Sequence, residues 1–184
     1  MAVETEPTIW TIGHGTRPVE VFLDLLAGAG VRRLVDVRTV PGSRRNPQFG
    51  REALSAALGT AGIAYEWRKS LGGLRRPRGD SPHTAIRNAS FRGYADHMES
   101  EEFGQGLRWL TDTSRDLPTA VMCAESLWWR CHRRMIADAL TVRGWRVVHL
   151  MEHGRVEQHR LHPNVRVEGA RLLYDVEDLP TLPA

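Results

Sequence analysis

The sequence has few of the features that mark specialised classes of protein. Two cysteines in 184 residues are too few for a disulfide-rich scaffold. No apolar run approaches the ~18–20 residues of a membrane-spanning helix, and the acidic N-terminus lacks the basic and apolar segments of a signal peptide. We therefore expect a cytoplasmic protein with no membrane partner. Hydrophobic residues at 41% and charged residues at 26% are typical of a folded globular chain.

Lysine is almost absent, since Lys69 is the only lysine among 25 basic residues. The net charge of +3 also hides an uneven distribution. Between Arg32 and Arg92, 13 basic and 4 acidic residues give +9, whereas the remaining 12 basic and 18 acidic residues give −6. Because the guanidinium group suits phosphate, this cluster predicts an anionic partner, either nucleic acid or a phosphorylated small molecule. A genome that favours arginine codons is the alternative explanation.

Hydrophobic periodicity predicts alternating strands and helices. The expected strands are Thr8–Gly13, Leu34–Val37, Ile63–Trp67, Thr119–Cys123 and Arg146–Met151. The expected helices span Val19–Leu26, Gly50–Leu58, Ser90–Met98, Glu101–Ser114 and Cys131–Arg143. A long loop is expected over Ser70–Asn88. This order indicates a single α/β domain, 1–184, with a mostly parallel sheet of about five strands flanked by helices. Residues 151–184 form a C-terminal extension with a small hairpin around Val165–Tyr174.

Ligands of open parallel sheets bind at the carboxyl ends of the strands, so the polar residues that follow each strand are the site candidates. After the first strand, Gly13 lets the backbone approach a ligand closely, and His14 is a candidate acid/base or phosphate contact. A tight turn with a structural histidine is an equally good interpretation. The segment lacks the third glycine of a dinucleotide fingerprint and the Gly-Lys-Ser/Thr of a P-loop.

After the second strand, Asp36 is a candidate for proton transfer and Arg38 for substrate binding. They lie on the same face of the strand, so a salt bridge between them is the slightly stronger interpretation. Arg44, Arg45 and Arg92 are then expected to contact phosphate. The adjacent Tyr94 offers an aromatic ring for stacking.

After the fourth strand, Cys123, Glu125 and Cys131 bring together two thiols and a carboxylate. If Cys131 opens a helix, the helix dipole, His132 and Arg133 lower its pKa, which makes it a candidate nucleophile. His132 and Arg133 are also expected at the substrate, and Glu125 is a candidate acid/base.

Metal ligation by Cys123, Cys131 and His132, with His14 as a further ligand, is an alternative role for the thiols, and inert packing is another. Two cysteines and one adjacent histidine do not make a zinc signature. The sequence therefore predicts no metal and no cofactor.

These motifs together resemble the domain-of-unknown-function family 488. The matching segments are Thr11–His14, Val35–Arg38, Ser43–Pro47 with Phe49, Leu71–Gly73, Phe91–Tyr94, Met122–Glu125 and Cys131–Arg133. The resemblance spans about residues 9–150 and implies a fold class and a site, but no reaction.

Two functions fit the sequence. The first is an enzyme, a hydrolase or a transferase, that acts on a phosphate-bearing ligand such as a nucleotide or a nucleic-acid base. It requires His14, Asp36, Arg38, Glu125 and Cys131 to meet in one cleft. The second is a non-catalytic nucleic-acid-binding module that uses the arginine-rich loop from Arg68 to Arg78.

Overall fold

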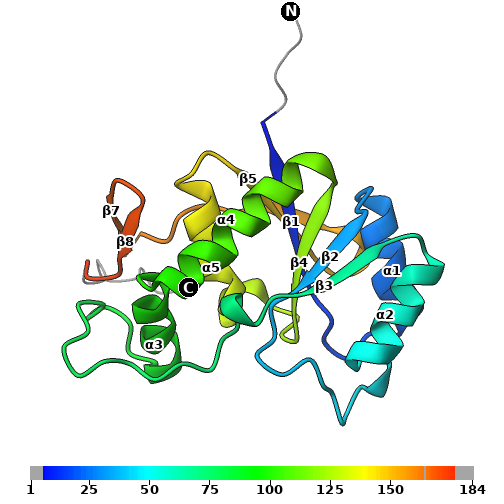
Figure 1. Cartoon of the computed structure of the whole chain (residues 1–184), viewed down its shortest axis with the longest axis horizontal. Helices are drawn as coiled ribbons and strands as arrows, with labels where there is room; N and C mark the ends of the chain where they lie inside the picture. The colour runs from blue at the N-terminus through cyan, green and yellow to red at the C-terminus, as the bar shows by residue number, and fades with distance from the viewer. Residues whose placement is uncertain (1–5, 164, 177–184) are drawn as a thin grey trace, which may run out of the picture.

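The computed structural model describes residues 6–163 and 165–176, and six of its strands form one sheet. The strands are β1 (Thr8–Gly13), β2 (Arg33–Asp36), β3 (Ala64–Trp67), β4 (Thr119–Cys123), β5 (Arg146–Leu150) and β6 (Val156–Gln158). Their order is β3-β2-β4-β1-β5-β6, with β1 to β5 parallel (Figure 1). The predicted α/β class is confirmed. The sequence missed β6, a three-residue exposed strand that pairs antiparallel with β5.

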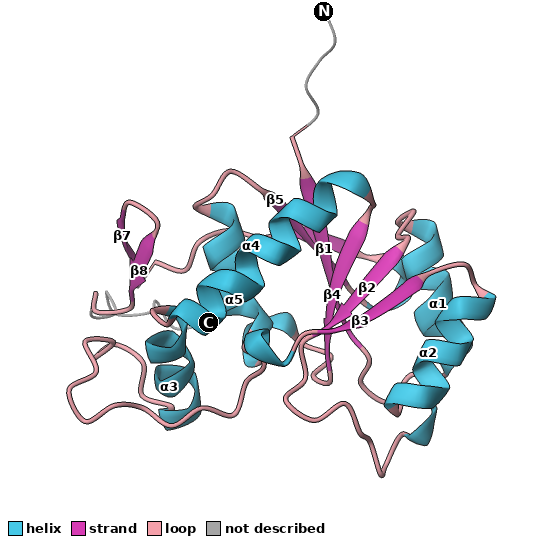
Figure 2. Cartoon of the chain, viewed as in Figure 1, coloured by secondary structure: helices cyan, strands magenta, loops and turns pink. Residues whose placement is uncertain are grey.

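Helices cover both faces of the sheet. They are α1 (Val19–Gly28), α2 (Arg51–Thr60), α3 (Ala89–Met98), α4 (Glu101–Asp116) and α5 (Arg133–Thr141). Helices α1 and α2 lie on one face, and α4 and α5 lie on the other with α3 beside them (Figure 2). Alternate strand residues supply the two cores, so Leu34 and Met122 pack with α1 and α2, whereas Val35 and Val121 pack with α4 and α5.

The order of the strands creates a switch point between β1 and β4. The connections that leave β1 and β2 run towards one edge of the sheet through α1 and α2. The connections that enter and leave β4 run towards the other edge, through α3 and α4 and then α5, on the opposite face. Chain segments therefore diverge above the carboxyl ends of β1 and β4, where α/β proteins characteristically bind ligands.

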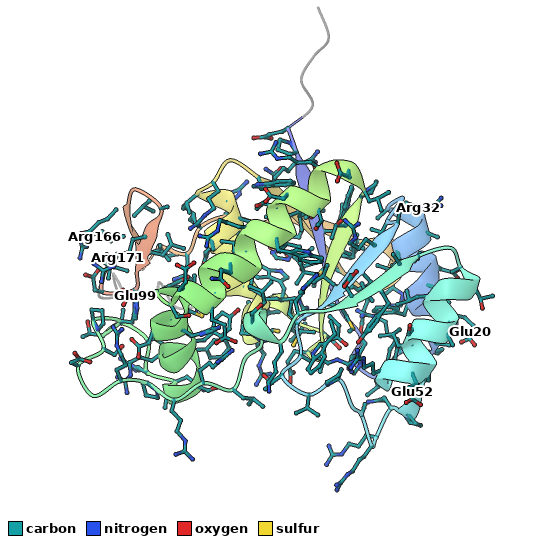
Figure 3. All side chains as sticks on the ribbon, viewed as in Figure 1. Glu20, Arg32, Glu52, Glu99, Arg166 and Arg171 are labelled. Carbon is teal, nitrogen blue, oxygen red and sulfur yellow. The ribbon has the colours of Figure 1, made fainter. Side chains whose placement is uncertain are left out.

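The predicted C-terminal hairpin is present as β7 (Arg166–Glu168) and β8 (Arg171–Leu173). Leu172 joins the core that contains α4 and α5, and Arg171 donates a 2.7 Å hydrogen bond to Glu99 after α3 (Figure 3). The end of the predicted extension, 177–184, lies outside the described residues. Within the described part, no helix has the length and apolar character needed to cross a bilayer.

Candidate functional site

The loops that follow β1 and β4 continue the pairing of the two strands. The backbone N–H of His14 donates to the carbonyl of Cys123 at 3.0 Å, and that of Gly15 donates to Ala124 at 2.9 Å. A Cβ atom on Gly13 would lie 1.8 Å from the carbonyl oxygen of Glu125. Gly13 packs against the protein's own backbone where the two loops touch, so only glycine fits at position 13.

Arg133 fixes the loop after β4. Its side chain is 1% exposed, and Nη1 and Nη2 donate to the carbonyl oxygens of Glu125 at 2.5 Å and Ser126 at 2.9 Å. The sequence predicted a phosphate contact for this arginine. That contact remains a prediction, and in the structure the guanidinium holds the segment that carries Glu125.

Cys123, Cys131 and His132 form a compact group at the end of β4. The His132 Nδ1 atom lies 3.7 Å from the Cys123 sulfur and 3.8 Å from the Cys131 sulfur. The expectation that Cys131 opens a helix is wrong, because a short 3-10 turn over Trp128–Arg130 precedes it and α5 begins only at Arg133. The extended backbone of Cys131, φ −128° and ψ 148°, turns its thiol towards Cys123 before the helix starts.

The orientation of the His132 ring is set by a backbone carbonyl. Its Nε2 atom lies 3.1 Å from the carbonyl oxygen of Val37, which can only accept, so Nε2 carries the hydrogen and donates it. In the neutral ring the Nδ1 lone pair then points at both sulfurs. Gly73 passes so close that a Cβ there would lie 2.8 Å from Nδ1.

The two thiols differ in acidity. The hydrogen bond with Cys131 and, as the second largest cause, burial raise the pKa of Cys123 far above its ordinary value. Burial also acts to raise the pKa of Cys131. The hydrogen bond from Cys123, with the charge and backbone N–H of Arg133, outweighs burial and lowers that pKa to about 7. The Cys131 thiolate is therefore stabilised by neighbours rather than by the helix dipole that the sequence suggested.

This difference predicts selective alkylation of Cys131 in a buffer that contains a chelator. Near pH 7 the thiolate fraction of Cys131 is large and that of Cys123 is negligible, so we expect Cys131 to react with iodoacetamide at least about tenfold faster, after allowance for its lower intrinsic nucleophilicity. The Cys131 rate should level off above about pH 7. The measurement is labelling of the Cys123→Ser and Cys131→Ser variants across pH.

Denaturant provides the control for this labelling, because both unfolded thiols should react alike with midpoints near the ~8.5 of free cysteine. Equal and slow labelling of the two folded variants, with that same midpoint, would contradict the assignment.

Two adjoining cavities lie at this end of the sheet. One, of about 350 Å³, is lined by the two buried cysteines and His132 and also by Arg38, Arg130 and Glu125, with Leu74, Phe91 and Tyr94 among its apolar walls. The other, of about 530 Å³, is more open and polar and includes His14, Arg44, Arg45 and Asn46. Gly42, Ala124 and Glu125 line both cavities. Among the described residues that line the two cavities, Glu125 is the only one with a carboxylate. Its side chain has no ion-pair partner within the described part of the chain.

His14 is buried, 3% exposed, and stacked on Phe49 with ring centroids 4.5 Å apart. Its Nδ1 lies 2.8 Å from the carbonyl of Gly15 and therefore donates, which leaves the Nε2 lone pair facing Arg38 Nη1 at 3.4 Å. Burial lowers the pKa of His14. The ring is thus a neutral group with both nitrogens engaged, at the edge of the polar cavity.

Asp36 and Arg38 form the predicted salt bridge. Arg38 Nη2 lies 2.6 Å from Asp36 Oδ2, and Arg38 Nε lies 2.9 Å from Oδ1. Tyr65 donates a further 2.8 Å hydrogen bond to the same carboxylate, and Arg38 Nη1 donates to the carbonyl of Phe49. Asp36 is fully buried behind Arg38 and lines neither cavity, so its proposed part in proton transfer remains a prediction.

The remaining predicted contacts divide into three groups. Arg44 and Arg45 are exposed beside the polar cavity, and neither has an ion-pair partner among the described residues. Tyr94 lines the apolar cavity but is 1% exposed, with its hydroxyl donating to the carbonyl of Leu71. Arg92 is half-buried on α3 and lines neither cavity.

Sequence reasoning missed the parts of the site that act through their backbone. Val37 orients His132 by its carbonyl, and Gly73 makes room for the Nδ1 atom. The paired glycines of Leu71–Gly73 were the available signal, because adjacent glycines often mark a close backbone approach. No pattern in the sequence indicates which side chain they approach.

A model of the family described as "Domain of unknown function DUF488" matches residues 18–140. No curated protein and no solved structure matches the chain. The matched residues carry Asp36, Arg38, Glu125, both cysteines and His132, whereas His14 lies before them.

Proposed function

Because the chain belongs to the DUF488 family, whose description assigns no activity, we propose its function from the cleft: an enzyme that acts on a phosphate-bearing ligand of the nucleotide or nucleic-acid-base type. The observation that carries the proposal is the junction of the two cavities at Glu125. One cavity is partly apolar and is lined by two thiols and an imidazole, and the other presents Arg44 and Arg45, which have no ion-pair partner among the described residues. Groups suited to reaction and groups suited to anion binding therefore line two cavities that share Gly42, Ala124 and Glu125.

The chemistry of each cavity matches one part of such a ligand. Phosphate oxygens accept hydrogen bonds from guanidinium groups. Arg44 and Arg45 are exposed, and within the part of the chain that the structure describes no carboxylate pairs with either of them. A planar base packs well against apolar and aromatic side chains such as those of Leu74 and Phe91. Glu125, placed where the cavities join, is the candidate for proton transfer.

The alternative of a binding module built on the loop from Arg68 to Arg78 has less support. Arg75 lies 3.7 Å from Glu102, and Arg78 is paired with Glu99 at 2.8 Å. Arg68 stacks over Trp109 at 3.4 Å from the ring centroid. These arginines are engaged with the protein's own groups, which leaves Arg76 as the exposed one without an ion-pair partner in the described structure.

Nucleotide titration tests the proposal. We expect nucleoside 5′-monophosphates to bind more tightly than the matching nucleosides, because only they carry the phosphate charge that Arg44 and Arg45 are proposed to bind. The Arg44→Ala/Arg45→Ala variant should bind them about tenfold or more weakly, since hydrogen bonds to charged groups contribute about 1.5–3 kcal/mol each. Calorimetric titration gives both comparisons.

Arg76→Ala is the matched control, because it removes an exposed arginine that lines neither cavity. An equal loss of affinity in Arg76→Ala would indicate general charge attraction. Absence of nucleotide binding, or equal affinity for nucleosides and nucleotides, would contradict the proposed function.

A further inference from the structure

We propose that Cys123, Cys131 and His132 bind one zinc ion, whose fourth coordination position faces the apolar cavity. The inference rests on the arrangement of three donor atoms and stands whether or not the ligand is a nucleotide. It selects metal ligation among the roles that the sequence left open for the thiols.

The spacing of the donor atoms suits a single tetrahedral ion. The two sulfurs and the His132 Nδ1 all lie within 4.8 Å of one another. Zinc bonds of ~2.3 Å to sulfur and ~2.0 Å to nitrogen at a tetrahedral angle require separations of about 3.5 Å between nitrogen and sulfur. The observed 3.7 and 3.8 Å need only a small contraction to satisfy both bonds.

The histidine is prepared as a ligand before any ion binds. The hydrogen bond from Nε2 to the Val37 carbonyl places the N–H of the neutral ring away from the sulfurs, so Nδ1 offers its lone pair to the space between them. A backbone carbonyl behind the imidazole is the usual outer partner of a metal-bound histidine. Gly73 keeps that side of the ring free of a Cβ atom.

The donor set also selects the class of metal. Two thiolates with one imidazole favour zinc over magnesium or calcium, which prefer oxygen ligands. The two thiolate charges balance the charge of the ion, so a buried cluster becomes electrically neutral. His14, the fourth ligand that the sequence offered, is excluded because its nitrogens face Gly15 and Arg38.

Three protein ligands leave one position open. Among the described residues the group contains no fourth histidine, cysteine or carboxylate, and all three ligands line the apolar cavity. Structural zinc sites normally have four protein ligands, whereas catalytic sites keep one position for water or substrate. The arrangement therefore indicates a site of the catalytic type, with Glu125 nearby on the same lining.

Metal binding is tested on the full chain, reduced and freed of metal, by zinc titration against a chromophoric chelator. We expect one equivalent to bind with a Kd below about 10⁻⁷ M. Cobalt should give the near-ultraviolet sulfur-to-metal charge-transfer absorption of thiolate ligation. Cys123→Ser, Cys131→Ser and His132→Ala should each lose tight binding, whereas the exposed His153→Ala should retain it.

Gly73→Ala keeps all three ligands and tests the site if a ligand variant fails to fold. Its methyl group would lie 2.8 Å from Nδ1, so zinc affinity should fall at least tenfold while circular dichroism remains native. Micromolar or weaker binding by the wild type, unchanged binding by Cys131→Ser, or recovery of the thiols as a disulfide under the reducing conditions would overturn the zinc proposal. Nucleotide titration of the metal-free and zinc-loaded protein reports separately on the proposed function.

Discussion

Replacing Asp138 by alanine is expected to lower the free energy of unfolding by about 2–6 kcal/mol, because it leaves two buried donors without an acceptor and each costs about 1–3 kcal/mol. Asp138 lies on α5 and is fully buried. Its Oδ1 accepts a 2.8 Å hydrogen bond from His159 Nε2, and its Oδ2 accepts a 2.9 Å hydrogen bond from the Tyr174 hydroxyl. Alanine leaves both donors buried without an acceptor.

The effect extends along a chain of hydrogen bonds. Because His159 donates from Nε2, its Nδ1 accepts from His149 Nε2 at 3.0 Å, and His149 Nδ1 accepts from the Thr11 hydroxyl at 2.7 Å. Burial, and to a smaller extent the neighbouring His159 and Arg133, lowers the pKa of His149 to about 2, so that ring is neutral as the chain of hydrogen bonds requires. The network joins α5, β5 and β1 to residues that follow β6 and β8.

Urea denaturation of Asp138→Ala, Asp138→Asn and Asp112→Ala measures this contribution. Asp112 is an exposed aspartate on α4, so the same replacement there should change stability by less than about 0.5 kcal/mol. Asparagine at 138 keeps one acceptor and should give an intermediate loss. If Asp138→Ala were as stable as Asp112→Ala, the network would contribute nothing to folding.

The sequence predicted the parts of the fold that depend on local pattern. Strands β1, β4 and β5 are rich in apolar and β-branched residues, and their predicted bounds agree with the structure to within one residue. The hairpin of β7 and β8 was also predicted. Strand β6 was missed because its three residues are exposed, so it has no buried face to produce an alternating pattern.

The candidate site was predicted in position but not in detail. Strand ends in a parallel sheet meet at one edge, which is why Arg38, Glu125 and Cys131 line one cavity. Their partners depend on side-chain direction and on distant backbone groups. The carbonyl that orients His132 comes from Val37, 95 residues away, and the carboxylate of Asp36 turns towards Arg38 and Tyr65.

Arg38→Met is expected to lower the free energy of unfolding by about 3–5 kcal/mol, because it leaves the Asp36 carboxylate buried without its counter-charge. Asp36→Asn/Arg38→Met removes both charges and should recover about 2–3 kcal/mol of that loss as coupling between the two sites. Arg32→Met is the control, since Arg32 is exposed just before β2 and lacks an ion-pair partner among the described residues (Figure 3). Urea denaturation of the two single variants and the double variant completes the cycle.

The nucleotide affinity of the folded double variant then shows whether Asp36 and Arg38 serve only the stability of the fold or also contact the ligand. The guanidinium charge of Arg38 is already balanced by Asp36, and the same group donates a hydrogen bond to the Phe49 carbonyl. If the pair is structural, the double variant should bind nucleotides within about threefold of the wild type, a difference below 1 kcal/mol. A native fold combined with a tenfold loss of affinity would instead place Asp36 or Arg38 on the ligand. That result would support the predicted part of Asp36 in proton transfer. Since its carboxylate is fully buried, it would also mean that Arg38 moves aside when the ligand binds.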